Sequence, residues 1–497
     1  MKTGCIVCFL ITLAFTARAE IPNPAAELIH VALSAMGGEE KIRNLNGIHF
    51  EASVVRNALE QSERPEGPYI VENSQVEEWR DLKHSAWRRT AKLHVAMQPE
   101  FVMTSVVSES AASLSYNGQQ VPASGEQIQN AAEVFALSPE RVLITALDSS
   151  DLHSLPDLTL QGVLHHTVEF GWRGSPVRIY INADTHLPTA VQWVAAYPYG
   201  IFWSIWGDVT TRAYYSFWWL QNGIHYPLQT DLVRDGLPDQ TVTITKLDFN
   251  PTLATGQFVV PSETRIAFAA TATKTIEDRT PAETTTALAP GILLIPGAWN
   301  TTIIRQEDGI VILEAPISSG YSAKVIQIAQ SKFPGMRIKA VITTSDSWPH
   351  VGGVREYVAH EIPVYVLDRT VPLLQRFLHA PRTRYPDLLA LSPHREKLRA
   401  VSSKTLIGAG PNRLEIYPIH GETSERQIMV YFPEYKLLYG SDPFQQLEDG
   451  TFFYPQTVYE LQSAAGREHL SVDRFFMMHI EPNPWSKVLK TVEDAQR

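Results

Sequence analysis

Cysteine is almost absent from this sequence of 497 residues, which has only Cys5 and Cys8. Both lie in one apolar run at the start of the chain, so the remainder has no residue for a disulfide, a thiol nucleophile or a thiolate–metal bond. The sequence also lacks a block of Lys and Arg, and its formal net charge is −11. These features argue against a nucleic-acid partner and against an anionic membrane surface.

Long apolar runs are lacking as well. The run "CIVCFLITLAF" (residues 5–15) is too short to span a bilayer as a helix. Lys2 precedes it, and the small residues of "ARA" follow it up to Ala19, which is the pattern of a secretory signal peptide. We therefore expect a signal peptide over residues 1–19, a mature chain that starts at Glu20, no membrane span, and a periplasmic or secreted location.

The length of the chain predicts more than one domain, and the sequence pattern changes near residue 265. Residues 266–290 are rich in Ala and Thr without a strong period, which is typical of a linker. The expected division is a first domain over residues 20–265, the linker, and a second domain over residues 291–497.

The first domain has a mainly β pattern. Apolar residues alternate in "VRIYIN" (residues 177–182) and at the start of "TVTITKLDF" (residues 241–249), and turn sequences separate such runs. Near the start, "AAELIHVALSAMGG" (residues 25–38) has helical spacing and ends at a Gly pair. One helix followed by many antiparallel strands predicts a strongly curved sheet around an apolar interior.

Several stretches of this domain carry a resemblance: "AMGGEEKIRNLNGIHFEA", "INADTHLPTAVQW" and "WGDVTTRAYYSFWWLQNGIHYPLQTDL". Over about residues 25–260 the chain resembles the lipoprotein-carrier-like half-barrel proteins of bacterial envelopes. That resemblance implies a curved half-barrel with a cavity for a small-molecule or lipid-like ligand. Large aromatic residues can line such a cavity or fill a β core, and both interpretations apply to Trp203, Trp206, Trp218 and Trp219.

In the second domain, strands alternate with helices. "NTTIIRQEDGIVILEAP" reads as a hairpin with Asp308-Gly309 at its turn, "YSAKVIQIAQSKFP" as an amphipathic helix, and "IKAVIT" as a buried strand. The pieces "DGIVILEAP", "KAVITTSDSWPHVGGVREY", "MVYFPEYKLLYGSDPF" and "VDRFFMMHIEP" follow in an order that resembles the metallo-β-lactamase fold. The resemblance implies an α/β sandwich of two sheets between outer helices, and a hydrolase-like protein.

Members of that family carry His-x-His-x-Asp-His before a Gly-Gly pair, where the side chains bind zinc. In the register set by the Gly-Gly pair of "TTSDSWPHVGGV", His350 matches the last histidine. Pro349 replaces the aspartate, and Ser345 and Ser347 replace the two leading histidines. Proline has no ligand atom, and a protonated serine hydroxyl is a poor zinc ligand.

The family's remaining ligand positions are spread over the last eighty residues. The third histidine falls on Thr423, with His420 three residues too early, whereas the bridging carboxylate is kept as Asp442 and the final histidine as His479. The first metal position has thus lost its three histidines. The second keeps His350, Asp442 and His479.

Three such ligands suffice for one Zn²⁺ with water in the fourth place, and a His-His-carboxylate set would also suit Mn²⁺ or Fe²⁺. Asp346 is a weaker candidate for a substitute carboxylate. Each of the three main residues also has a structural interpretation, such as capping a helix or bonding the backbone. The metal interpretation requires their ligand atoms to lie within about 5 Å of one another, with Ser345 and Ser347 facing the same cleft.

Other catalytic motifs are missing: there is no Gly-x-Ser-x-Gly, phosphate loop or His-Glu-x-x-His sequence. Glu425 and Arg426 border the site in the register of the family and are expected to be salt-bridged surface residues. Two functions stay open. One is an exported one-metal hydrolase of ester, lactam, lactone or phosphoester bonds. The other is a pseudoenzyme whose first domain binds a lipid-like or envelope ligand.

Overall fold

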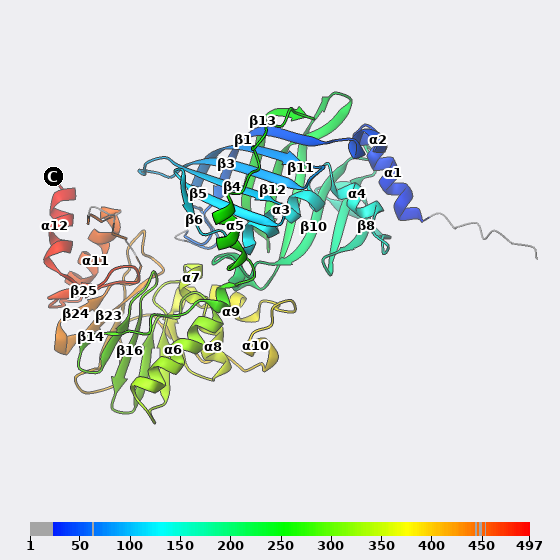
Figure 1. Ribbon diagram of the computed structural model, residues 1–497. Helices are drawn as coiled ribbons and strands as arrows, with labels where there is room; N and C mark the ends of the chain where they lie inside the picture. Colours follow the sequence, from blue (N-terminus) through cyan, green and yellow to red (C-terminus); the bar gives the residue numbers. More distant parts are fainter. Residues whose placement is uncertain (1–22, 62–63, 443–444, 447–449, 453) are drawn as a thin grey trace, which may run out of the picture.

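The computed structural model describes residues 23–61, 64–442, 445–446, 450–452 and 454–497 (Figure 1). The expected signal peptide, residues 1–19, lies outside this part of the chain. None of the described helices is long and apolar enough to cross a membrane.

The first part of the chain forms one antiparallel sheet of thirteen strands, in the order β6-β5-β4-β3-β2-β1-β13-β12-β11-β10-β9-β8-β7. The first and last strands meet in the middle, because β1 pairs with both β2 and β13. The expected strands over residues 177–182 and 241–249 lie within β9 and β13 and are confirmed. The strands are β1 (Gly47–Asn57), β2 (Val71–Asp81), β3 (Ala86–His94), β4 (Phe101–Ser108), β5 (Ala111–Tyr116), β6 (Gln119–Val121), β7 (His153–Leu160), β8 (Val163–Trp172), β9 (Ser175–Asn182), β10 (Pro188–Ala196), β11 (Asp208–Gln221), β12 (Ile224–Arg234) and β13 (Leu237–Phe249).

Apolar side chains of helices pack against the sheet in the core of this part. The expected first helix is present as α1 (Pro24–Met36), which begins at the side-chain cap of Asn23 and ends at Gly37 with φ 123°. Its apolar face packs with side chains of the sheet and of α4. The other helices here are α2 (Glu39–Arg43), α3 (Gly125–Leu137), α4 (Val142–Leu147), α5 (Ser262–Ala269) and the short η1 (Trp203–Trp206).

The second part contains two sheets of seven and six strands. The hairpin expected around Asp308-Gly309 is confirmed, because β16 and β17 pair antiparallel through Gln306 and Gly309. The strands of the first sheet are β14 (Thr286–Ala289), β15 (Ile292–Ile295), β16 (Thr301–Gln306), β17 (Gly309–Leu313), β18 (Ile338–Ile342), β19 (Val364–Leu367) and β20 (Leu398–Val401). Those of the second are β21 (Thr405–Ile407), β22 (Leu414–Pro418), β23 (Ile428–Phe432), β24 (Leu437–Tyr439), β25 (Arg474–Phe476) and β26 (Asn483–Pro484).

These two sheets face each other and helices cover their outer sides (Figure 1). Buried aliphatic and aromatic side chains of both sheets fill the space between them. Helices α6 (Ser319–Lys332), α8 (Val354–Ala359) and α9 (Val371–His379) pack on the seven-stranded sheet, and α11 (Pro455–Arg467) and α12 (Ser486–Ala495) on the other. The short α7 (Trp348–Val351), α10 (Leu388–Leu391), η3 (Asp368–Thr370) and η4 (Pro433–Tyr435) lie in connections. An α/β sandwich is therefore present in the second part.

The segment expected as a linker contains short structured stretches. Residues 266–290 include the end of α5, the turn η2 (Ile276–Asp278) and the edge strand β14. Phe268 is 4% exposed, Ile276 4% and Leu288 7%. These three residues pack into three different hydrophobic cores, so the segment is attached to the rest of the chain at several points.

The two parts also share a hydrophobic core. Trp206 and Tyr197 of the first part belong to the same buried cluster as Trp348 and Phe377 of the second. Of the four tryptophans in question, Trp203 and Trp206 thus lie at this junction, Trp218 packs on the core of the sheet, and Trp219 is 51% exposed.

One glycine at this junction gives a direct test of the packing. Gly207 has φ 68°, and a Cβ atom on it would lie 2.1 Å from the carbonyl oxygen of Pro381. We expect Gly207→Ala to lower the free energy of unfolding by about 2–4 kcal/mol, because left-handed strain and a backbone clash add up. Urea denaturation measures the loss.

Gly236→Ala is the matched control, since Gly236 has φ 81° and open space around its Cβ position. Gly236→Ala should lower the free energy of unfolding by about 1 kcal/mol, from the strain of the left-handed backbone alone. Equal losses in the two variants would contradict the close approach of Gly207 and Pro381.

Candidate metal site

The three residues expected as metal ligands come together at one edge of the sandwich. His350 lies in α7, shortly after β18, Asp442 follows β24, and His479 follows β25. β24 and β25 are parallel neighbours, so the segments after them emerge side by side. One ligand atom from each of the three residues lies within 4.8 Å of the others.

Asp442 occupies the centre of this group. Its Oδ2 lies 3.0 Å from His350 Nε2, and its Oδ1 lies 3.1 Å from His479 Nε2. The side chains are largely buried, with exposed fractions of 2% for His350, 8% for Asp442 and 19% for His479. Burial alone would raise the pKa of Asp442, but the two imidazoles hold this pKa well below its usual range. Asp442 is therefore ionised in the folded chain.

The contacts of His479 require a positive charge, carried by a proton or a metal ion, between its ring and Asp442. His479 Nδ1 lies 2.5 Å from the carbonyl oxygen of Ala298, which can only accept, so Nδ1 carries a proton. In neutral His479 the lone pair of Nε2 then faces Asp442 Oδ1, a buried oxygen with no hydrogen-bond partner among the described residues. Two lone pairs at this distance repel, so either a second proton on the ring or a shared cation must lie there.

The His479 ring can either carry a second proton or bind a metal ion through Nε2. Burial lowers the pKa of His479, yet the contact with Asp442 outweighs it and the pKa is raised overall. A ring that donates Nδ1–H to a carbonyl and presents Nε2 is also the usual arrangement of a metal-bound histidine. Two imidazole nitrogens and one carboxylate therefore fit one divalent ion.

The replaced positions of the metal loop have other partners. Ser347 Oγ donates to the carbonyl oxygen of Glu60, 2.9 Å away in the first part of the chain. Ser345 Oγ accepts a hydrogen bond from the amide of Ser347 at 3.2 Å. The expectation that both serines face the cleft of the metal group is thus wrong for Ser347, because the first part of the chain covers this side.

Asp346 is also engaged elsewhere. Its Oδ2 accepts from Arg426 Nε at 2.6 Å, so it is not a substitute ligand in the group. Glu425 pairs with Arg64 at 2.9 Å and with Arg369. Glu425 and Arg426 are salt-bridged, as expected.

The loop that would hold the third histidine is built around a carboxylate. The amides of Glu422, Thr423 and Ser424 all donate to the side chain of Glu460 on α11, at 2.9–3.1 Å. His420 is exposed. No ligand replaces the missing histidine at Thr423, since this residue serves the Glu460 contact.

Sequence reasoning missed a buried acid next to the group. Glu314, directly after β17, contacts Thr344 Oγ1, which lies 2.8 Å from Ser441 Oγ, and Ser441 Oγ donates to the Thr344 carbonyl at 3.0 Å. Thr344 Oγ1 donates to the carboxyl group of Glu314. Burial raises the pKa of Glu314 to about 8. The sequence feature that could have indicated a buried acid is the glutamate at the end of the apolar run "GIVILE".

The structure resembles solved metallo-β-lactamases over less than half of its length. The metallo-β-lactamase from Pontibacter korlensis is 14% identical, over 43% of this chain and 99% of its own, with a TM-score of 0.34. FIM-1 from Pseudomonas aeruginosa, in its mono-zinc form, is 18% identical over 43% and 94%, with a TM-score of 0.31. The stereoselective inverting sec-alkylsulfatase Pisa1 from a Pseudomonas species is 14% identical over 42% and 40%, also at 0.31.

Neither a protein family model nor a curated protein matches the chain. TM-scores of this size carry no argument about function, which must follow from the chain's own residues.

The protonated state of Glu314 gives a pH prediction for metal-free protein. Its pKa is raised in the folded chain, so its contribution to stability is full below the unfolded value and is lost as pH rises towards about 8. Between pH 5 and pH 8 the free energy of unfolding should fall by up to about 1.4 kcal/mol per pH unit from this group. Glu314→Gln keeps an acceptor for the Thr344 hydroxyl and should remove most of the slope, as measured by denaturation in EDTA.

Glu434→Gln, an exposed glutamate of the same part of the chain, serves as the control and should keep the slope. An unchanged slope in Glu314→Gln would mean that Glu314 is ionised in the folded chain.

Proposed function

We propose that this chain is a metallo-β-lactamase-like hydrolase that binds one divalent ion, with zinc as the first candidate, through His350, Asp442 and His479. The substrate would carry an ester, lactam, lactone or phosphoester bond. The observation that supports the proposal most is the convergence of ligand atoms of His350, Asp442 and His479 within 4.8 Å of one another, with His479 Nδ1 committed to Ala298. Mn²⁺ or Fe²⁺ would suit the same donors.

When bound, such an ion acts as a Lewis acid towards water and the scissile bond. The residues of the chain do the rest. Asp442 and both imidazoles hold the ion, and the Ala298 carbonyl fixes the ring of His479. Glu314 stays neutral, so it adds no second negative charge beside Asp442, and its hydroxyl chain holds the backbone at Ser441, which precedes that ligand.

A second candidate function has its own observation. Ser347 bonds the carbonyl of Glu60, and Asp346 bonds Arg426, so both side chains have partners other than a metal ion. This favours a pseudoenzyme that keeps the sandwich as a scaffold and whose first part binds a lipid-like or envelope ligand. Metal content and turnover separate the two candidates.

The metal prediction is one ion per chain. Purified protein dialysed against zinc and measured by plasma mass spectrometry should contain about one equivalent. His350→Ala and His479→Ala should each reduce this to near zero, because two ligands seldom retain zinc. His420→Ala, which alters an exposed histidine nearby, should leave one equivalent. A chain without zinc at saturating concentration would reject the hydrolase and favour the pseudoenzyme.

The zinc-loaded chain should then hydrolyse at least one of four chromogenic substrates, an ester, a β-lactam, a lactone or a phosphodiester, and His479→Ala should not. Bound zinc without turnover on any of them would leave a metal site but favour the pseudoenzyme.

We also propose that residues 1–19 direct export and that the mature chain divides into residues 20–265 and 291–497, joined by residues 266–290. Expressed with its full sequence in a bacterial host, the chain should appear in the periplasm or medium. N-terminal sequencing should begin at Glu20. An intact Met1 on protein from that fraction would reject the signal peptide.

A further inference from the structure

The short helix that carries His350 is packed against the first part of the chain. Trp348, the first residue of α7, meets Trp203 and Trp206 of η1 edge to face, with ring centroids 4.8 Å and 5.2 Å apart. Trp206 also packs on Phe377 of α9 at 4.8 Å. Trp348 and Trp206 are each 3% exposed. One aromatic cluster therefore contains residues of both parts and lies two residues from His350.

A hydrogen bond joins the same two parts just before α7. Ser347 Oγ donates to the carbonyl of Glu60 at 2.9 Å, and Glu60 is itself held by the side chain of Arg56. The two residues that precede Pro349 and His350 are thus both fixed by groups from the first part of the chain.

Helix α7 depends on contacts with other segments. It spans four residues, and no side chain among the described residues caps its start. A helix this short has no stability of its own, so packing and tertiary hydrogen bonds fix its position. From the second part it is held by the bond from Ile317 N to the Pro349 carbonyl at 2.7 Å, by the packing of Trp348 on Phe377 at 6.2 Å, and by the contact of His350 with Asp442 at 3.0 Å. The contacts from the first part add to these and act on the residues just before His350.

We infer that the first part of the chain positions His350 for metal binding, through Trp203 and Trp206 against Trp348 and through Glu60 on Ser347. These are positioning residues, and their role rests on the proposed metal function. Edge-to-face aromatic pairs stabilise beyond their buried area, so the loss of one that holds the α7 segment should weaken metal binding about tenfold.

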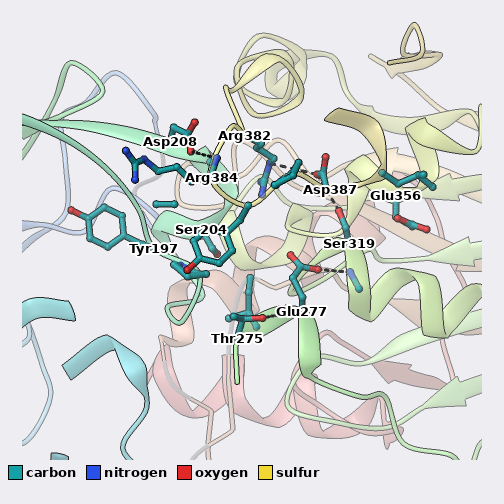
Figure 2. Close-up of a pocket in the computed structure, with 18 residues that line it drawn as sticks. Tyr197, Ser204, Asp208, Thr275, Glu277, Ser319, Glu356, Arg382, Arg384 and Asp387 are labelled. Atoms are coloured by element: carbon teal, nitrogen blue, oxygen red, sulfur yellow. Dashed lines mark hydrogen bonds and ion pairs between the residues drawn. The ribbon is translucent and has the colours of Figure 1, made fainter. Parts of the chain in front are cut away.

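A second joint holds the two parts together at different residues. It surrounds a cavity of about 410 Å³ between them (Figure 2). Here Asp208 accepts from Thr383 N at 2.7 Å, Arg382 donates to the Ile205 carbonyl at 2.9 Å, and Arg384 to the Gly174 carbonyl at 2.8 Å. These contacts should keep the two parts of the chain together when one tryptophan is replaced. A change in metal binding at His350 can then be distinguished from separation of the two parts.

The test compares four variants of the full mature chain. Trp203→Ala and Ser347→Ala remove contacts to the α7 segment. Arg384→Ala perturbs the second joint only, and Trp219→Ala removes an exposed tryptophan from the same sheet. Zinc affinity is measured by competition with a chromophoric chelator, and amide hydrogen exchange of residues 345–353 is measured without metal.

Trp203→Ala and Ser347→Ala should each weaken zinc binding about tenfold and speed exchange in residues 345–353, whereas the two control variants stay within about twofold of the parent. Trp203→Phe should restore most of the affinity. Equal behaviour of Trp203→Ala, Ser347→Ala and the controls in both measurements would overturn the inference. If Trp203→Ala does not fold, Ser347→Ala, which loses only a hydroxyl, decides.

A parent chain that has no metal site would give different results. The parent chain would then bind no zinc, and the exchange comparison alone would still show whether the first part of the chain holds residues 345–353. Faster exchange only in the two α7 variants would support positioning, and uniform exchange would overturn it.

Discussion

One buried negative charge organises this site. Asp442 is ionised, 8% exposed and placed between His350 and His479, and each imidazole nitrogen lies close to a different carboxylate oxygen. Such a charge is tolerated only with partners, because a buried ion left unpaired costs several kcal/mol. The neighbouring acid Glu314 is also buried, but it avoids an unpaired negative charge by staying protonated. Two adjacent carboxyl groups thus have different charge states, and a metal ion would face a single full negative charge.

The neutral acid also ties the sandwich together. Glu314 follows β17, Thr344 follows β18, and Ser441 follows β24, so the chain of hydroxyl groups joins both sheets at the edge that carries Asp442. Glu314 and Ser441 have left-handed backbone conformations, with φ 78° and 67°. Side-chain-bearing residues adopt this region at a cost, and such strain is typical of functional sites. The hydrogen bonds that fix the ligand loop also offset that strain.

Much of this arrangement could be predicted from the sequence, and the failures have physical reasons. Alternation and turn residues predicted strands such as β9 and the Asp308-Gly309 hairpin, and the Gly-Gly register predicted that His350, Asp442 and His479 meet. Local patterns carry such information because they reflect one element at a time. The partner of Asp346 and the bond from Ser347 to Glu60 depend on residues far away in the chain, and no local pattern encodes them.

The segments around Ser347 and Thr423 make structural contacts. Ser347 bonds the carbonyl of Glu60 in the first part of the chain, and the amide of Thr423 donates to Glu460. Replacing Ser347 with histidine would therefore remove a hydrogen bond between the two parts. His350 is 2% exposed and His479 19%, so the group is most open to solvent beside His479, where the ring of Trp299 packs edge to face at 5.8 Å. In the proposed one-metal hydrolase, a substrate would therefore approach past Trp299 and His479, while the first part of the chain lies on the side of His350.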